Sequence, residues 1–217
     1  SIYVNHESIY QHIYDTAQKG EKLWEYLRYG KKRRTKKQGR RSQRSIIPGR
    51  VWIDERPSDV EEREEIGHYE SDTIMYGKQR GINSLVERVT RYVMLARLTD
   101  KKPKTTRDVL LKRLQEQQVK SITFDNGVEN RDHQEVASKL NVKTYFCHPY
   151  SSWEKGTNEN VNGMVRRYLP RDTDLSTVSD QELKAIENEL NSRPRKILGY
   201  RTPQELLEYY YKFALAN

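Results

Sequence analysis

The sequence predicts an α/β fold, in which a mixed five-stranded sheet is flanked by helices and preceded by a short helical N-terminal appendage. Three apolar runs with short connections, at about His68 to Met75, Ile82 to Val89 and Tyr92 to Leu98, are typical of an antiparallel meander. Helix-like and strand-like patterns then alternate between residues 105 and 147. A meander followed by this alternation favours a mixed sheet with helices on its faces.

Residues 1–30 are predicted to be the helical appendage. Apolar residues recur at helical spacing between residues 6 and 28, and Gly20 divides them into two short helices. Two such helices are too few to bury a core alone. We therefore expect this segment to be the remnant of a larger helical domain.

Residues 31–57 are predicted to form a basic linker or arm, and residues 58–217 the catalytic core. Residues 31 to 50 hold ten Lys or Arg and no acid, whereas the rest of the chain holds 30 basic and 31 acidic residues. Ten like charges repel one another, and a polyanion relieves that repulsion. DNA contact is the favoured interpretation and a solvated linker the alternative. The cations assigned to DNA binding are Lys31, Lys32, Arg33, Arg34, Lys36, Lys37, Arg40 and Arg41.

The later elements of the core follow from periodicity and capping signals. Strands are expected at residues 121–125 and 143–147, and helices at residues 105–118, 131–140, 157–169 and 180–191. The final helix is expected to start at Thr202-Pro-Gln-Glu205, which places a capping Thr, a Pro at the first helical position and a Glu three residues after the cap.

Three acidic residues stand on three of these elements. Asp72 lies in the first strand, Asp125 ends a later strand, and Glu159 lies in the first turn of a helix. A fold that gathers them would offer the oxygen ligands that magnesium prefers. Two such ions can activate a nucleophile and stabilise the leaving oxygen of a phosphoryl displacement. Each acid taken singly also fits a cap, a turn or a solvated charge.

The helix that carries Glu159 is predicted to have two distinct sides. At about 100° per residue, Val161 and Val165 share the packing side, while Glu159, Asn162 and Arg166 face away from it. We expect this second side to be unpacked and to face DNA. Trp153 could stack on a base or simply anchor the loop. The candidates for DNA contact in this region are Trp153, Lys155, Asn158, Asn162, Arg166 and Arg167.

Other site classes find little support in the sequence. Glu70 and Glu129 are assigned surface or structural roles, and Glu154 a partner such as Lys155 or solvent. One cysteine and five histidines without zinc-like spacing argue against a disulfide framework and a soft-metal site. No apolar stretch of about 18 residues occurs, so no membrane partner is expected.

Two segments carry a resemblance to a known family. Asp72, Asp125 and Glu159, with 33 residues between the last two, resemble the DDE triad of the transposase and retroviral integrase superfamily, whose cores have a ribonuclease H-like fold. Residues 148–170, which include Trp-Glu-Lys-Gly-Thr-Asn-Glu-Asn, closely resemble the signature of bacterial insertion-sequence transposases of the IS-thirty family. Residues 191–205 are similar to that family's closing motif.

The resemblance implies a DNA transposase that cleaves element ends and joins them to target DNA. It implies Asp72, Asp125 and Glu159 as catalytic ligands of two Mg²⁺ ions, with Mn²⁺ able to substitute. It also implies double-stranded DNA as partner, a homo-oligomer in a synaptic complex, and a cytoplasmic, nucleoid-associated location in a bacterium. The family has a full helix-turn-helix region, of which only the last part resembles residues 4–14, so the chain is expected to be a fragment.

Two rival functions remain open at this point. Another ribonuclease H-like integrase or nuclease is compatible with the triad alone, although the two motifs favour a transposase. A catalytically idle, transposase-derived DNA-binding regulator is the second alternative, and the intact acids argue against it.

Overall fold

The computed structural model describes residues 4–27, 32, 47–149 and 151–214. It divides the chain into two compact units, Ser1–Arg44 and Ser45–Asn217. The first unit contains α1 (His6–Gln18) and the 3₁₀ helix η1 (Leu23–Tyr26). They are separated at Gly20, as the sequence predicts, where φ is +92° and a side chain would be strained.

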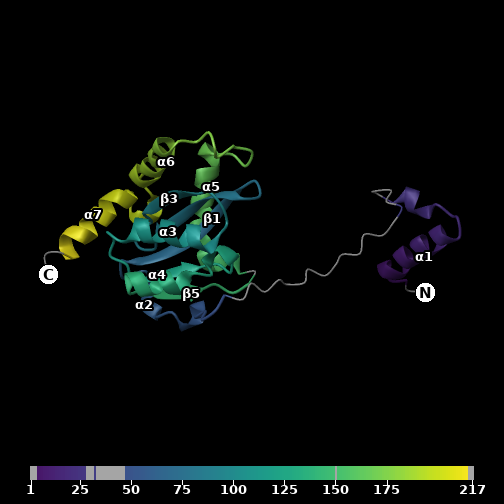
Figure 1. Ribbon diagram of the computed structural model, residues 1–217, viewed down its shortest axis with the longest axis horizontal. Helices are drawn as coiled ribbons and strands as arrows, with labels where there is room; N and C mark the ends of the chain where they lie inside the picture. The colour runs from purple at the N-terminus through teal and green to yellow at the C-terminus, as the bar shows by residue number, and fades with distance from the viewer. Residues whose placement is uncertain (1–3, 28–31, 33–46, 150, 215–217) are drawn as a thin grey trace. The chain divides into compact units, whose positions relative to one another are not determined.

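The second unit is built on a mixed five-stranded sheet (Figure 1). Strands β1 (His68–Tyr76), β2 (Arg80–Glu87) and β3 (Val93–Leu98) form the antiparallel meander. Strands β4 (Ser121–Phe124) and β5 (Lys143–Phe146) continue the sheet in parallel with β1. The order β3-β2-β1-β4-β5 places β1 at the centre, where the pairing changes from antiparallel to parallel. The predicted mixed sheet is confirmed.

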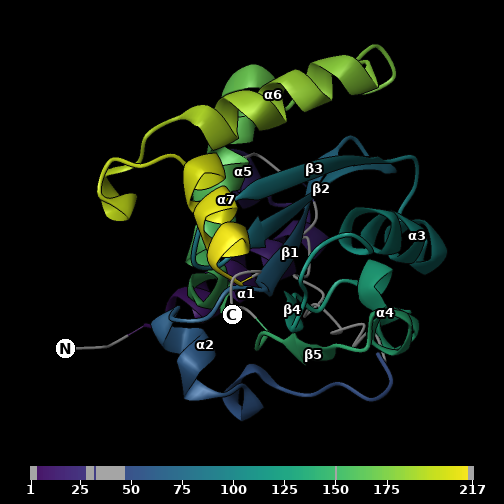
Figure 2. The same ribbon diagram turned by 90° about the vertical axis from the view of Figure 1, so that its left-hand side faces the viewer.

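Helices cover both faces of this sheet (Figure 2). One face carries α3 (Pro103–Leu114) and α4 (His133–Leu140), and the other carries α5 (Gly156–Tyr168) and α6 (Asp180–Ser192). The remaining elements are α2 (Ser58–Glu62), α7 (Pro203–Ala214) and the 3₁₀ helices η2 (Ile53–Glu55), η3 (Val128–Asn130), η4 (Ser152–Lys155) and η5 (Lys196–Leu198). Among the helices described, none is long and apolar enough to cross a membrane.

Each face of the sheet has its own apolar core. Ile82 packs with Val161 of α5 and Leu190 of α6 on one face. Leu85 packs with Leu110 of α3 on the other. Burial of such side chains stabilises a fold by roughly 1.5–3 kcal/mol each. The core between the sheet and α3 therefore stabilises the sheet. The core between the sheet and α5 and α6 holds α5 against β1 and β2, where the candidate site lies.

The core begins earlier than the sequence predicts. Residues 47–57 were expected in the basic linker, yet Ile47 is 4% and Ile53 8% exposed. Trp52 forms a parallel bridge with Phe146 at the end of β5. These apolar residues interrupt the basic stretch and are drawn to the sheet because burial is favourable. The predicted boundary at residue 58 is thus preceded by residues that already pack on the core.

The expected start of the final helix is confirmed. The backbone N–H of Glu205 donates to Thr202 Oγ1 at 3.1 Å, and the backbone N–H of Thr202 donates to Glu205 Oε2 at 2.8 Å. This capping box satisfies two backbone donors at once.

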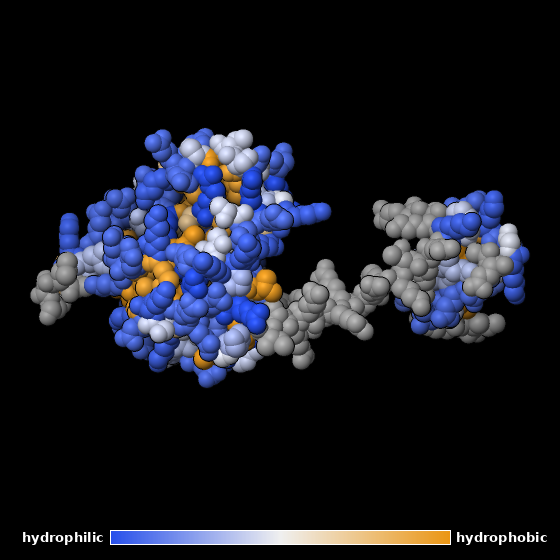
Figure 3. Space-filling view, viewed as in Figure 1, coloured by the Kyte–Doolittle hydropathy of each residue, from blue (hydrophilic) through white to orange (hydrophobic). Residues whose placement is uncertain are grey.

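Figure 3 shows that the visible face of this unit is mainly hydrophilic, with apolar side chains in small patches.

Candidate active site

The pairing of β1 with β4 brings the two aspartates together. The strands run parallel, with Glu70 opposite Thr123. Two residues further along each chain, this register leads to Asp72 and Asp125. Ligands in sheets of this kind gather at the carboxyl ends of strands, at a switch in topology such as the one at β1.

A buried ammonium lies at this pair of carboxylates. Lys155 Nζ donates to Asp72 Oδ1 and to the Ser71 carbonyl, each at 3.0 Å. Only 6% of Lys155 is exposed. Burial opposes its charge, but the attraction of Asp125 and then of Asp72 outweighs this, so the pKa of Lys155 is raised. The two aspartates therefore already surround a positive charge.

Neutral donors orient both carboxylates. Asn162 Nδ2 donates to Asp72 Oδ2, and Ser84 holds Asn162 by donating to its Oδ1 at 3.0 Å. Asn130 Nδ2 donates to Asp125 Oδ1 at 2.7 Å. Fixed carboxylates around a cation are a donor set that suits Mg²⁺ or Mn²⁺. The residues present therefore fit a hard divalent cation.

Glu159 lies on the same side of α5 as the aspartate pair. It is exposed, and it precedes Asn162 by three residues, which places both on one face of the helix. Asn162 contacts Asp72, so this face is turned toward β1. Among the described residues, however, no group of three or more His, Cys, Asp or Glu side chains is close enough to share a metal ion.

Glu129 is a further carboxylate near the site, to which the sequence assigned a surface or structural role. Burial, the nearby charge of Asp125 and the charge of Asp72 raise its pKa. Its side chain folds back over Gly127, where an added Cβ would lie 2.5 Å from the carboxyl carbon. The sequence signal for this placement is that Glu129 follows Asp125 by four residues. The 3₁₀ helix η3 stays near the end of β4, where Asn130 Nδ2 donates to the Asp125 carbonyl at 3.3 Å.

Arg166 is packed, contrary to the expectation of an unpacked face. Its Nη2 donates to the Met75 carbonyl at 2.7 Å, and its guanidinium lies 4.2 Å from the centroid of the Tyr76 ring. The reason is that Tyr76 follows Asp72 on the same face of β1, beneath α5. The buried Nη1 has no hydrogen-bond partner among the described residues, so one donor of this guanidinium is unsatisfied.

We predict that Arg166→Ala lowers the free energy of unfolding by roughly 1–2 kcal/mol, because it removes the packing against Tyr76 and a charged hydrogen bond. Val165→Asp should cost about 3 kcal/mol or more, because Val165 is 0% exposed and a carboxylate would be buried without a partner. Urea denaturation compares the two variants. An Arg166→Ala protein as stable as the wild type would contradict the packed arrangement, and a tolerated Val165→Asp would mean that α5 is rotated.

The other predicted DNA contacts fall in different places. Asn158 is 0% exposed, and neither of its side-chain polar atoms has a hydrogen-bond partner among the described residues, so it lies away from solvent. Arg167 and Lys32 are exposed. The side chain of Trp153 lies outside the described residues, as do Lys31, Arg33, Arg34, Lys36, Lys37, Arg40 and Arg41.

Two further acids have partners that differ from the simplest expectation. Glu154 accepts from the backbone N–H of His148 at 2.8 Å and pairs with its ring, rather than with Lys155. Hydrogen bonding to Glu154 raises the pKa of His148. Glu70 is 1% exposed and forms an ion pair with Arg88, which is a structural role.

Sequence comparison finds several transposases of insertion sequences among the relatives. No protein-family model matches the chain. It is 44% identical over 205 residues to the transposase for insertion sequence element IS4351 of Bacteroides fragilis, a match that covers 93% of this chain and 63% of that protein. It is 38% identical over 185 residues to the transposase InsI for element IS30A of Escherichia coli (strain K12), covering 84% of this chain and 48% of the relative. The chain therefore spans about half to three fifths of the length of these curated relatives.

Structural comparison identifies the fold. The catalytic core domain of BIV integrase matches with a TM-score of 0.54 and 18% identity, over 68% of this chain and 97% of that one. A chain of the simian T-cell lymphotropic virus intasome, in complex with PP2A regulatory subunit B56 gamma, matches with a TM-score of 0.54 and 16% identity, over 64% and 53% of the two chains. The ribonuclease H-like fold that the sequence predicts is confirmed.

Proposed function

This chain is a homologue of the insertion-sequence transposases, those of the IS30 type among them, and we propose that it carries the site at which such an enzyme cleaves and joins DNA. Asp72, Asp125 and Glu159 are its catalytic carboxylates. The observation that supports this most is the placement of Asp72 within β1 and of Asp125 at the end of the adjacent β4, with the positive charge of Lys155 between them. A site that reacts with phosphodiesters needs this concentration of hard oxygen ligands.

The carboxylates would hold two divalent cations, Mg²⁺ or Mn²⁺. When bound, such cations lower the pKa of an attacking water or 3′-hydroxyl and stabilise the leaving oxygen. Asn162 and Asn130 keep Asp72 and Asp125 in fixed orientations through their hydrogen bonds. Fixed ligands reduce the reorganisation needed as the reaction proceeds. The same site would first hydrolyse the phosphodiester at an element end and would then serve the attack of the freed 3′-hydroxyl on a target phosphodiester, which breaks that bond and releases a target 3′-hydroxyl.

Double-stranded DNA is the proposed partner, both as element end and as target. The partly exposed Arg166 and the exposed Arg167 are placed to contact phosphates near Glu159. Lys155 would also contact a phosphate once bound cations displace its ammonium from the aspartates. The basic arm of residues 31–44 would add contacts that carry no sequence information, and the helices α1 and η1 would contribute to recognition of the element end. A homo-oligomer that holds two ends would allow both to react together.

Strand transfer tests this proposal. A labelled duplex with a free 3′-hydroxyl at the element end is mixed with the protein and a plasmid target. With Mg²⁺ we expect joined products, and with Ca²⁺ we expect DNA binding without products, because calcium takes looser coordination than the reaction requires. Products that form equally well in Ca²⁺ or in the presence of a chelator would contradict the assignment.

A further inference from the structure

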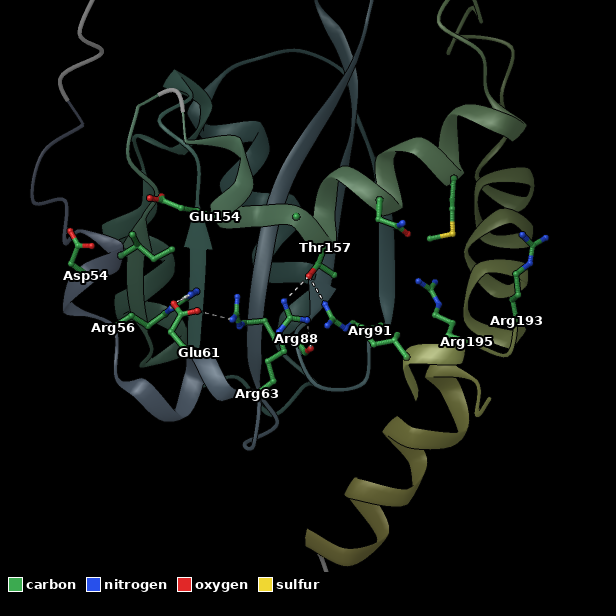
Figure 4. Close-up of a pocket in the computed structure, with 15 residues that line it drawn as sticks. Asp54, Arg56, Glu61, Arg63, Arg88, Arg91, Glu154, Thr157, Arg193 and Arg195 are labelled. Carbon is green, nitrogen blue, oxygen red and sulfur yellow. Dashed lines mark hydrogen bonds and ion pairs between the residues drawn. The ribbon is translucent and has the colours of Figure 1, made fainter. Parts of the chain in front are cut away.

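A cavity of about 930 Å³ lies beside α5 (Figure 4), and neither Asp72 nor Asp125 lines it. Helix α5 presents Thr157, Asn160 and Met164 to this cavity. Glu159 and Asn162, on the face that turns to Asp72, are about half a turn away from Thr157 and Asn160. The helix therefore separates two different surfaces of the same unit.

Arginine dominates the lining of this cavity. Its charged residues are the cations Arg56, Arg63, Arg88, Arg91, Arg193 and Arg195 and the anions Asp54, Glu61 and Glu154. Arg56 and Arg88 both pair with Glu61, and Arg88 also pairs with Glu70, so these two cations are neutralised. Asp54 and Glu154 pair with His148. Arg193 pairs with Glu189 of α6, outside the lining. Arg63, Arg91 and Arg195 are therefore the lining arginines with no carboxylate partner among the described residues.

Two of these arginines converge on one neutral acceptor. Arg63 Nη2 donates to Thr157 Oγ1 at 3.2 Å, and Arg91 Nη1 donates to the same oxygen. Neither forms an ion pair with a carboxylate in the part of the chain that the structure describes. Each guanidinium has five N–H donors in a planar fork. One shared hydroxyl therefore accepts only a small part of the hydrogen bonds that the two arginines can donate. Two like charges at one hydroxyl repel each other unless an anion joins them.

The backbone at both arginines is unusual. Arg63 ends α2 with φ +59°, and Arg91 lies in the β2–β3 turn with φ +61°. Gly or Asn normally takes this left-handed conformation, as Asn141 does at the end of α4 with φ +54°. A non-glycine residue with positive φ is uncommon because its Cβ clashes with the backbone. The fold keeps two such residues where they direct guanidinium groups at the same point.

We propose that this cavity binds the sugar-phosphate backbone of a second DNA segment, distinct from the strand that reacts at Asp72 and Asp125. Phosphate oxygens would accept from Arg63 and Arg91, because the guanidinium fork matches phosphate in a bidentate arrangement. The first turn of α5, at Gly156 and Thr157, adds backbone N–H groups and a dipole that favour an anion.

Duplex DNA fits this surface better than an acidic protein segment. The described lining has few apolar side chains, Ile53, Met164 and Ile197 among them, whereas protein interfaces depend on a buried apolar centre. The identity of the ligand rests on the proposed function, since strand transfer brings two DNA segments to one protein. The cavity would bind one of these two segments on the side of α5 that carries Thr157 and Asn160.

Binding of a short duplex of random sequence tests the proposal without any catalytic metal. Arg63→Gly/Arg91→Gly removes both forks while glycine accepts the positive φ, so the variant should melt at or above the wild-type temperature. We expect roughly tenfold weaker binding and a salt slope reduced by about 1.8, because each phosphate that the protein no longer neutralises accounts for about 0.9 of that slope. Lys104→Ala/Lys139→Ala removes the same charge from exposed positions on α3 and α4 and should change the slope by much less. Equal slopes and affinities for the two double variants would overturn the proposal.

Cross-linking locates the bound duplex independently of the basic arm. Asn160→Cys places a thiol at an exposed position of the cavity, while Cys147 is buried. A duplex with a tethered disulfide should cross-link to this position, and the cross-link should be lost when Arg63 and Arg91 are glycine. Asn188→Cys, exposed on α6, is the control. A yield no higher than the control would overturn the proposal, whereas absent strand transfer with an intact cross-link would overturn only the proposed function.

Discussion

Lys155→Met is expected to destabilise the metal-free protein by about 3 kcal/mol, since it leaves the carboxylates of Asp72 and Asp125 without the cation that both attract. Lys155 is 6% exposed and 3.0 Å from Asp72 Oδ1. The lower end of the usual range for a broken buried pair applies, because the Asp72 side chain is 22% exposed and partly solvated. The pKa of Lys155 is raised above that of a free lysine. Its contribution to stability is therefore complete at neutral pH and is lost only as the pH rises through the raised folded-state value.

Mg²⁺ should restore much of the stability that this substitution removes. The ion would replace the ammonium between Asp72 and Asp125, and in the wild type it must first displace Lys155. Thermal melting with increasing Mg²⁺ should therefore show a larger upward shift for Lys155→Met than for the wild type. Lys139→Met, at an exposed position on α4, is the control for removal of a surface charge. A stable Lys155→Met protein with no gain in its response to Mg²⁺ would contradict the competition between lysine and metal.

The strands of the sheet and the positions of the two aspartates on them could be predicted because local signals determine them, whereas the pairing of β1 with β4 that brings the aspartates together is a tertiary contact. Alternating apolar residues define the strands of the meander. Asp125 ends an apolar strand before Asn126-Gly127, a turn signal that the structure places at the end of β4. The outward position of Glu159 followed from the period of an α-helix, and the exposure of that residue agrees with it. These features need no knowledge of distant segments.

Features that depend on tertiary contacts were not predictable in the same way. Lys155 lies in a 3₁₀ turn before α5, where no period indicates which side chain is buried. Arg166 has the helical position expected of it, but the sequence could not indicate that Tyr76 lies beneath it. The arginine cavity joins residues from α2, the β2–β3 turn, α5 and the segment after α6. Arg63 and Arg91 also have positive φ, which Gly and Asn normally adopt, so the sequence did not indicate their backbone conformation.

The largest effect on activity is expected at Asp125. Asp125→Asn keeps the size of the side chain and its hydrogen bond with Asn130 but removes the charge that would hold a cation. Strand transfer should fall by on the order of 1000-fold, a loss typical of removing a group that stabilises charge in the transition state. DNA binding should be retained, because the basic arm and the arginines are unchanged. The loss would therefore appear in product formation and not in affinity.

The central claim, that Asp125 is a ligand of the catalytic metal, is tested most directly by strand transfer with Asp125→Cys in Mg²⁺ and in Mn²⁺. A thiolate is a poor ligand for hard Mg²⁺ and a better one for the softer Mn²⁺. We expect almost no product in Mg²⁺ and partial recovery in Mn²⁺, while Asp125→Asn stays inactive in both and the wild type is active in both. Transfer at the wild-type rate by Asp125→Asn in Mg²⁺ would show that the reaction does not use this carboxylate and would contradict the account.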